Sequence, residues 1–167
     1  MSDKFKRVLV FSDTHGNIRN MMSIIEKSRP LYAVIHLGDV EGDENRIKTY
    51  LGKNVKTYFV RGNNDFFTEL PKEMEIDLGG HRCLLTHGHN YGVGMDAYRL
   101  SMEAQARNCD IAFFGHTHRP YFRNIEGVLC INPGSISYPR QANGKASFLL
   151  IEIDENQELH FNESYYI

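Results

Sequence analysis

The beginning of the chain lacks a long hydrophobic run. Only four consecutive residues there are apolar, at positions 8–11, before polar residues return. A secretion signal needs an apolar stretch of about 7–15 residues, and a membrane-spanning helix needs about 20. We therefore expect no signal peptide, no membrane partner and a cytoplasmic protein.

Cysteine is scarce as well. The chain has 3 cysteines, Cys83, Cys109 and Cys130, which are widely spaced and mostly lie among apolar neighbours. An odd and scattered set of this kind excludes a disulfide framework, and it lacks the paired spacing of a zinc ribbon. We expect three reduced thiols in the core.

Charge of one sign is not in excess. The 19 Lys and Arg residues nearly balance 21 Asp and Glu residues, which gives a formal net charge of -2. A protein that binds nucleic acid in general needs a broad basic surface, so we expect no such binding. A small, nucleotide-sized substrate is still compatible with this charge.

Internal repeats, low-complexity tracts and linkers rich in Pro, Gly or Ser are also missing. A chain of 167 residues is long enough for one core that buries roughly 70 per cent of the unfolded surface. We predict a single domain over residues 1–167.

Short apolar runs rich in β-branched and aromatic residues predict five early strands. They lie at residues 7–12, 32–38, 55–62, 81–88 and 111–116. Helical spacing of apolar residues follows Asn17, the expected cap, and residues 96–109 repeat it more weakly. Strands that alternate with helices predict a parallel sheet. Consecutive strands at residues 121–131, 146–153 and 158–167 favour a second, largely antiparallel sheet packed on the first.

Each of the five early strands is followed at once by side chains that can bind metal ions. The groups are Asp13, His15, Asp39, Asn63, His87, His116 and His118. One such residue alone is more often a turn former or a helix cap. Because loops at the carboxyl ends of neighbouring strands lie side by side, we expect the whole set to meet at one edge. Two carboxylates, four imidazoles and an amide oxygen suit two divalent ions, and the lack of a nearby thiolate argues against a zinc-finger site.

In this order, the motifs D-x-H, G-D, G-N-x-D, T-H-G-H and G-H-x-H resemble those of the calcineurin-like metallophosphoesterases. With NPGS at residues 132–135, the chain resembles their small prokaryotic phosphodiesterase branch, which is similar to the retromer scaffold subunit of eukaryotes. The resemblance implies an α/β fold, a four-layer α/β/β/α sandwich of two mixed sheets flanked by helices. It also implies a ligand set, with Asp13, His15 and His118 on one ion, Asn63, His87 and His116 on the other, and Asp39 bridging the two.

The resemblance implies hydrolysis of phosphate esters with two divalent ions, Mn²⁺ being favoured over Ni²⁺, Zn²⁺, Fe²⁺ or Co²⁺. Two cations roughly 3.5 to 4 Å apart lower the pKa of a shared water and clamp the phosphoryl oxygens, so that the bridging hydroxide attacks in line. A covalent enzyme intermediate is not needed. The lack of GxSxG and Walker-type motifs agrees with this.

Asn64 and His89 are the candidate catalytic residues. Many family members have a histidine at the position of Asn64 that contacts the phosphate and helps the leaving group, with the acidic residue after it, here Asp65, available to orient the ring. The amide of Asn64 cannot deliver a proton near neutral pH. The resemblance associates the absence of the histidine with diester substrates. The alternative is that Asn64 is a simple turn residue. His89 lies two residues past His87, with a structural role as its alternative, and His36, His81 and His160 are expected to be structural.

We therefore predict a binuclear phosphodiesterase that acts on a small phosphate ester, with a protein-interaction scaffold of little turnover as the alternative. An exonuclease ranks third, because the chain lacks the basic surface for it. Residues 90–96 form either a substrate-facing loop or a plain connection. Arg61, Arg119 and Arg140 either contact phosphate or are ordinary surface residues, and a homo-oligomer is compatible with the sequence.

Overall fold

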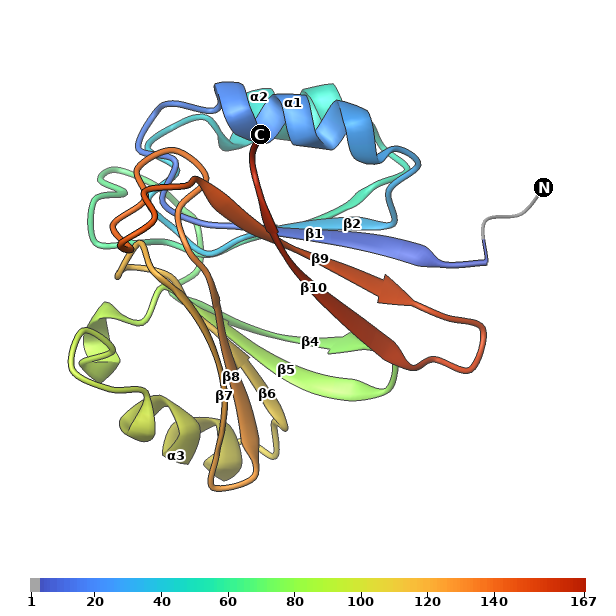
Figure 1. Ribbon diagram of the computed structural model, residues 1–167. Helices are drawn as coiled ribbons and strands as arrows, with labels where there is room; N and C mark the ends of the chain where they lie inside the picture. The colour runs from blue at the N-terminus through green and yellow to red at the C-terminus, as the bar shows by residue number, and fades with distance from the viewer. Residues whose placement is uncertain (1–3) are drawn as a thin grey trace.

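The computed structural model describes residues 4–167, so the first three residues of the predicted domain lie outside the described part. Within it, ten strands form two five-stranded mixed sheets (Figure 1). The first sheet has the order β10-β9-β1-β2-β3, with β1 Lys6–Phe11, β2 Ala33–His36, β3 Lys56–Phe59, β9 Ser147–Ile153 and β10 Leu159–Tyr165. The second has the order β4-β5-β6-β8-β7, with β4 Glu73–Leu78, β5 His81–Thr86, β6 Ile111–Phe113, β7 Pro120–Ile125 and β8 Val128–Pro133.

Helices cover the outer face of each sheet. Helices α1 (Arg19–Ser28) and α2 (Glu44–Leu51) lie on the first sheet, and α3 (Tyr98–Ala106) lies on the second (Figure 1). The layers are therefore helix, sheet, sheet, helix. The predicted four-layer α/β/β/α sandwich of two mixed sheets is confirmed.

Strand β1 shows why its sequence is continuously apolar. Val8 and Val10 point into the core between the two sheets, whereas Leu9 and Phe11 point towards the helices on the other face. All four side chains are fully buried. A strand covered on both faces must be apolar at every position, which is the pattern of a buried parallel strand.

The division into an early parallel sheet and a late antiparallel sheet is wrong. β5 and β6 belong to the second sheet, and the late strands are divided between the sheets, with β7 and β8 beside β6 and β9 and β10 beside β1. Local pattern identifies a strand, but register and sheet membership depend on contacts between distant segments. The antiparallel pair β1–β9 is such a contact.

The sequence patterns missed α2 and β4. Helix α2 buries only Ile47 and Leu51, which is a short apolar signal. Strand β4 lies at a sheet edge and alternates acidic with apolar residues, so it did not stand out as an apolar run. The prediction that Asn17 caps the first helix is also wrong, because Ile18 occupies that position and has no capping hydrogen bond.

Two other expectations from composition can be compared with the structure. Cys83, Cys109 and Cys130 are all buried and unpaired, as predicted. Burial raises the pKa of the Cys130 thiol to about 11, so it stays protonated at neutral pH. In the described part of the chain, no helix is long and apolar enough to cross a membrane.

Candidate metal centre

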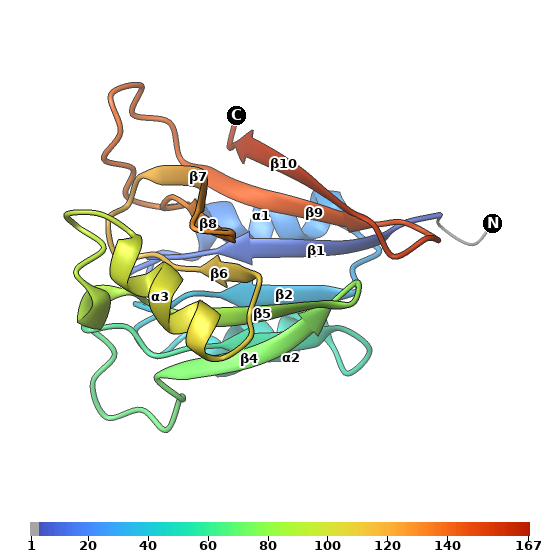
Figure 2. The ribbon, with the colours of Figure 1, turned by 90° about the horizontal axis from the view of Figure 1, so that it is seen from below.

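The loops after β1, β2, β3, β5 and β6 bring the predicted ligands together, although these strands come from two sheets. The loops that follow β1 and β6 meet at the left in Figure 2. Backbone hydrogen bonds join neighbouring loops within each sheet: Asp13 N donates to Gly38 O at 3.1 Å, and Gly115 N donates to His87 O at 3.0 Å. Between the sheets, the His116 backbone N–H donates to Asp13 Oδ2 at 3.0 Å. The two sheets therefore present their loops at one shared edge.

Asp13 lies at the centre of this edge and is fully buried. Its Oδ2 atom accepts hydrogen bonds from Ser12 Oγ at 2.6 Å and from the His116 backbone N–H at 3.0 Å. Its Oδ1 atom is buried without a hydrogen-bond partner among residues 4–167. Burial raises the pKa of Asp13, but contact with His118 and the nearby His87 outweighs it, so the pKa is lowered. Asp13 thus presents an ionised, unsatisfied oxygen to the site.

Three imidazoles have a fixed orientation because each Nδ1 atom is hydrogen-bonded away from the site. The pairs are His87 with Leu37 O at 2.7 Å, His118 with Tyr138 O at 2.7 Å, and His15 with Glu41 Oε1 at 2.8 Å. Carbonyl and carboxylate oxygens only accept, so each Nδ1 must carry the proton. In a neutral ring, the Nε2 lone pair then faces the site. Metal-binding histidines are typically held in this way.

These Nε2 atoms converge on each other and on the carboxylates. His15 Nε2 lies 3.1 Å from His118 Nε2, and His118 Nε2 lies 3.3 Å from Asp13 Oδ1. His87 Nε2 lies 3.4 Å from Asp39 Oδ2. Burial lowers the pKa of His87, but Asp39 and Asp13 outweigh it and hold the pKa above its ordinary value. The carboxylates of Asp13 and Asp39 therefore favour a positive charge beside them.

Asp39 and Asn63 complete the arrangement around His87. Asp39 accepts hydrogen bonds from Asn64 N at 2.8 Å and from Asn64 Nδ2 at 2.9 Å. Burial raises the pKa of Asp39, but contact with His87 and the bonds from Asn64 outweigh it and lower the pKa. Asn63 Oδ1 lies 3.0 Å from His87 Nε2 and 3.1 Å from His116 Nδ1. All seven predicted ligands thus lie in one connected cluster.

Backbone strain is concentrated in these residues. Five of them have φ values in the left-handed region: Asp13 (56°), His15 (45°), Asp39 (57°), His116 (68°) and His118 (58°). This conformation is unfavourable for residues with a side chain by roughly 1–2 kcal/mol each. Strain of this kind persists only where the surrounding structure imposes it, and it is common at functional sites.

Gly62 is required by a close approach of two loops. A Cβ atom at this position would lie 2.1 Å from Asp39 Oδ1 and 2.5 Å from the Asp39 backbone nitrogen. No side chain can be accommodated there without moving Asp39. The glycine before Asn63 therefore allows the β2 and β3 loops to pack against each other.

Two acidic residues that support the site were not predicted to do so. Asp65 is buried, and its carboxylate accepts three backbone hydrogen bonds of 2.7 Å, from Asp39, Glu41 and Gly62. Three of its acceptor positions are therefore occupied, and its role in orienting a ring at position 64 stays a prediction for the Asn64→His variant. Glu41 supports His15 through its Nδ1 atom. Neither role has a local sequence signal, because each depends on a loop from another strand or on a turn.

The NPGS motif supports the site from β8. Asn132 Nδ2 donates to Gly115 O at 2.8 Å, which holds the loop that carries His116. Ser135 Oγ donates to Asp13 O at 2.8 Å. The motif therefore fixes two ligand loops without taking part in the cluster.

His89 lies beside the cluster rather than in it. Its ring centroid is 5.4 Å from that of His87 and 6.1 Å from that of His116. Its Nδ1 atom is buried and has no hydrogen-bond partner within residues 4–167. Burial, with the positive charge of His87 and His116, lowers the pKa of His89. A group bound next to His87 and His116 would be within reach of this ring.

His36 is buried beneath the centre and has a structural environment, as predicted. Its Nδ1 atom accepts a hydrogen bond from Gly38 N at 3.2 Å, and its Nε2 atom lies 3.0 Å from Thr14 Oγ1. This pattern fixes the ring as neutral with the proton on Nε2. Burial lowers the pKa of His36 to about 4.

We expect His36 to make the metal-free protein sensitive to mild acid. The unfolded chain takes up a proton at this residue near pH 6.5, but the folded protein does so only near pH 4. Stability from this residue is therefore present above about pH 6.5 and is lost as the pH falls towards 4, by up to ~3 kcal/mol. Urea unfolding at pH 7.5 and pH 5 should show a smaller pH effect in His36→Gln than in the wild type. The exposed His81→Gln variant is the control, and an unchanged pH effect in His36→Gln would contradict the prediction.

Comparisons with known proteins identify the family of this chain. The family model described as the calcineurin-like phosphoesterase superfamily domain matches residues 7–156. A probable metallophosphoesterase of Mycoplasma genitalium is 31% identical over 166 residues, which cover 96% of this chain and 95% of that protein. A phosphodiesterase of Escherichia coli is 27% identical, with 94% of this chain and 93% of that protein covered.

Solved structures give the same result for the fold. A predicted phosphoesterase from Streptococcus pneumoniae has a TM-score of 0.76 and 26% identity, covering 98% of this chain and 99% of that one. Vacuolar protein sorting 29 from Cryptosporidium parvum has a TM-score of 0.75 at 21% identity, covering 98% and 99%, which shows a shared fold alone. By its sequence, its layers and the matched family model, this chain belongs to the calcineurin-like phosphoesterase superfamily.

Proposed function

We propose that the protein is a phosphodiesterase that uses two divalent metal ions, with Mn²⁺ the favoured ion. Their ligands would be Asp13, His15, Asp39, Asn63, His87, His116 and His118. In this proposal, Asp13, His15 and His118 hold one ion, Asn63, His87 and His116 hold the other, and Asp39 contacts both. The oxygen and imidazole donors of this set suit Mn²⁺ and its neighbours among the transition metals.

One observation carries the proposal: imidazole nitrogens and carboxylate oxygens converge in a largely buried space. His15 Nε2 and His118 Nε2 are 3.1 Å apart, and each ring directs its Nδ1 atom to an oxygen acceptor outside the cluster. Asp13 Oδ1 is buried beside them with no hydrogen-bond donor among the described residues. With both rings neutral in this orientation, each of these atoms presents a lone pair to the others, and a bound cation would stabilise the arrangement.

When bound, two divalent ions would supply an activated water and would neutralise charge on the phosphoryl oxygens. The chain's own residues prepare the site for this chemistry. The hydrogen bonds to Leu37, Tyr138 and Glu41 hold three imidazoles in place before any ion arrives. A preformed site of this kind avoids the free-energy cost of reorganisation during the reaction.

Asn64 supports a preference for diesters. Both its backbone N–H and its side-chain amide donate to Asp39, so the residue holds the shared carboxylate and has no acidic proton to offer. Diesters with good leaving groups need little protonation of the departing oxygen. His89 would act on the same substrate by a hydrogen bond from its ring, beside His87 and His116.

Assays of metal-reconstituted protein test the proposal. We expect hydrolysis of bis(p-nitrophenyl) phosphate, with kcat/KM at least ~10-fold above that for p-nitrophenyl phosphate, because the site lacks a positioned proton donor. The metal-free protein is the control and should be inactive. No hydrolysis of either ester by protein with two bound ions would contradict the proposal.

That negative result would favour the alternative, a protein-interaction scaffold on the same fold. Two observations support this alternative. Phe66 and Phe67, in the loop after Asn63, are 72% and 109% exposed, which is unusual for phenylalanine. The fold is also shared with vacuolar protein sorting 29.

A further inference from the structure

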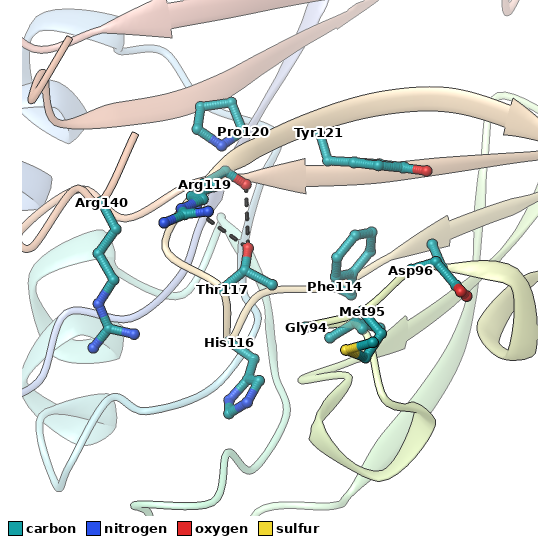
Figure 3. A pocket seen from close by; sticks show the side chains of 12 residues that line it. Gly94, Met95, Asp96, Phe114, His116, Thr117, Arg119, Pro120, Tyr121 and Arg140 are labelled. Atoms are coloured by element: carbon teal, nitrogen blue, oxygen red, sulfur yellow. Dashed lines mark hydrogen bonds between the residues drawn. The ribbon is translucent and has the colours of Figure 1, made fainter. Parts of the chain in front are cut away.

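A cavity of about 450 Å³ opens beside the cluster, on the side of His116. Its lining comes from residues 93–97, which precede α3, from the His116 loop, from the start of β7 and from Arg140. Figure 3 shows Arg140 to the left of His116 and Met95 and Asp96 to its right, with Arg119 above them beside Pro120. A molecule that reaches the cluster at His116 would therefore extend into this space.

One wall of the cavity is apolar and partly aromatic. Phe114 is buried behind it, and the ring of Tyr121 lies 5.6 Å from that of Phe114 at an angle of 63°. Val93 continues the wall, and Met95 stands at the opening with 92% of its surface exposed. An exposed thioether opposite an aromatic wall makes a slot that suits a flat apolar group.

Two arginines and one aspartate, Asp96, line the cavity. Arg119 and Arg140 both line it, and within residues 4–167 neither guanidinium group forms a salt bridge. The backbone N–H of Arg140 donates to His118 O at 3.0 Å, so this residue is tied to the ligand loop. Guanidinium groups bind phosphate oxygens through paired hydrogen bonds.

A second cavity, of about 590 Å³, borders the cluster at His15 and His118. His15, His118, Tyr138, Pro139 and Arg140 line it. Arg140 is the residue that the two cavities share, and each cavity contains at least one histidine of the cluster. A phosphate at the cluster would thus have room for an organic group on each side, which is the shape of a diester.

We propose that the cavity beside His116 is a subsite for a planar aromatic or heteroaromatic ester group of the substrate, with Arg140 next to the phosphate. This inference rests on the proposed phosphodiesterase function and adds a substrate class to it. Met95 and Tyr121 contact the ring of this group from opposite sides, and the second cavity takes the other ester group.

Binding of two phosphonates that cannot be hydrolysed tests the subsite. Phenylphosphonate and methylphosphonate share the anionic group and differ in the ring. We expect Zn²⁺-loaded protein, studied by ligand-observed NMR, to bind phenylphosphonate about 10-fold more tightly, since the ring is removed from water. Met95→Ala and Tyr121→Ala should each reduce this preference at least ~3-fold and leave methylphosphonate binding unchanged.

Matched variants separate the subsite from general packing. Met102 is an exposed methionine on α3, and Phe122 is the neighbouring aromatic residue on β7; neither lines the cavity. Met102→Ala and Phe122→Ala should therefore keep the full preference. Met95→Ala removes a side chain that is almost wholly exposed, so loss of folding cannot explain its effect.

Two results would overturn the inference in distinguishable ways. If the wild type binds both phosphonates equally, or if the preference survives Met95→Ala and Tyr121→Ala, the subsite is wrong while the proposed function stands. If Zn²⁺-loaded protein binds neither phosphonate and Mn²⁺-loaded protein hydrolyses no diester, both proposals fail together.

Discussion

Replacing Asp39 with Ala is expected to abolish phosphodiester hydrolysis and to weaken the binding of both metal ions. Its Oδ2 atom lies 3.4 Å from His87 Nε2 and 3.6 Å from His15 Nε2, so it faces both halves of the cluster. Removing a partner behind a metal ligand typically reduces metal affinity or activity 10- to 100-fold. Loss of a ligand that both ions share should reduce activity further, so we expect kcat/KM to fall by more than ~100-fold.

Metal content and kinetics of purified variants decide this prediction. His15→Ala should mainly weaken one ion, because in the proposed assignment His15 binds only the ion that it shares with His118 and Asp13. Asp110→Ala is the matched control: it removes an exposed aspartate at the opposite end of β6 from His116. An Asp39→Ala protein that kept two tightly bound ions and normal turnover would show that the centre is assigned wrongly.

Introducing a histidine at position 64 should change the reaction class of the enzyme. Asn64→His supplies a proton donor next to Asp39, and general acid catalysis typically contributes ~10² to 10⁴-fold where leaving-group protonation limits the rate. The Asp65 carboxylate already accepts three backbone hydrogen bonds, so it has little remaining capacity to orient the new ring. We therefore expect a gain near ~10²-fold, for monoesters with poor leaving groups.

The test compares alkyl and aryl monoesters and diesters in the wild type and Asn64→His at equal metal loading. Alkyl monoesters should gain most, and aryl diesters should gain little or lose activity, since the Asn64 amide no longer donates to Asp39. Asn64→Ala is the control that removes this bond without adding a proton donor. Equal changes on all four substrates, or a monoester preference in the wild type, would refute a role of Asn64 in substrate choice.

The convergence of the seven proposed ligands was predictable from sequence because each lies in a loop that follows a strand. Asp13 comes two residues after β1, and His116 comes three residues after β6. An apolar run that ends at polar residues can be recognised in the local sequence. The loops at the carboxyl ends of parallel strands lie side by side, so these polar residues meet at one edge even when their strands belong to different sheets. The ligand set therefore did not depend on the wrong division of strands between the sheets.

The supporting residues were not predictable, because their roles depend on contacts across the fold. Asp65 holds the loop of Asp39 through backbone N–H groups, and Tyr138 orients His118 through a carbonyl oxygen. Asp65 belongs to the G-N-x-D motif, but the backbone groups that it binds have no sequence identity, so the motif alone does not identify this contact. The same holds for the cavity beside His116, whose walls come from residues as far apart as Val93 and Arg140.

Titration of the metal-free protein with Mn²⁺, followed by electron paramagnetic resonance and by hydrolysis of bis(p-nitrophenyl) phosphate, tests the central claim most directly. The cluster predicts two ions per chain, a spectrum of a spin-coupled Mn²⁺ pair, and activity that rises as the pair forms, because the two ions lie close enough to act on one phosphate. In Asp39→Ala the coupled spectrum should be lost. Full activity with one bound ion, or two bound ions whose spectrum is that of isolated Mn²⁺, would contradict a two-metal centre built around Asp39.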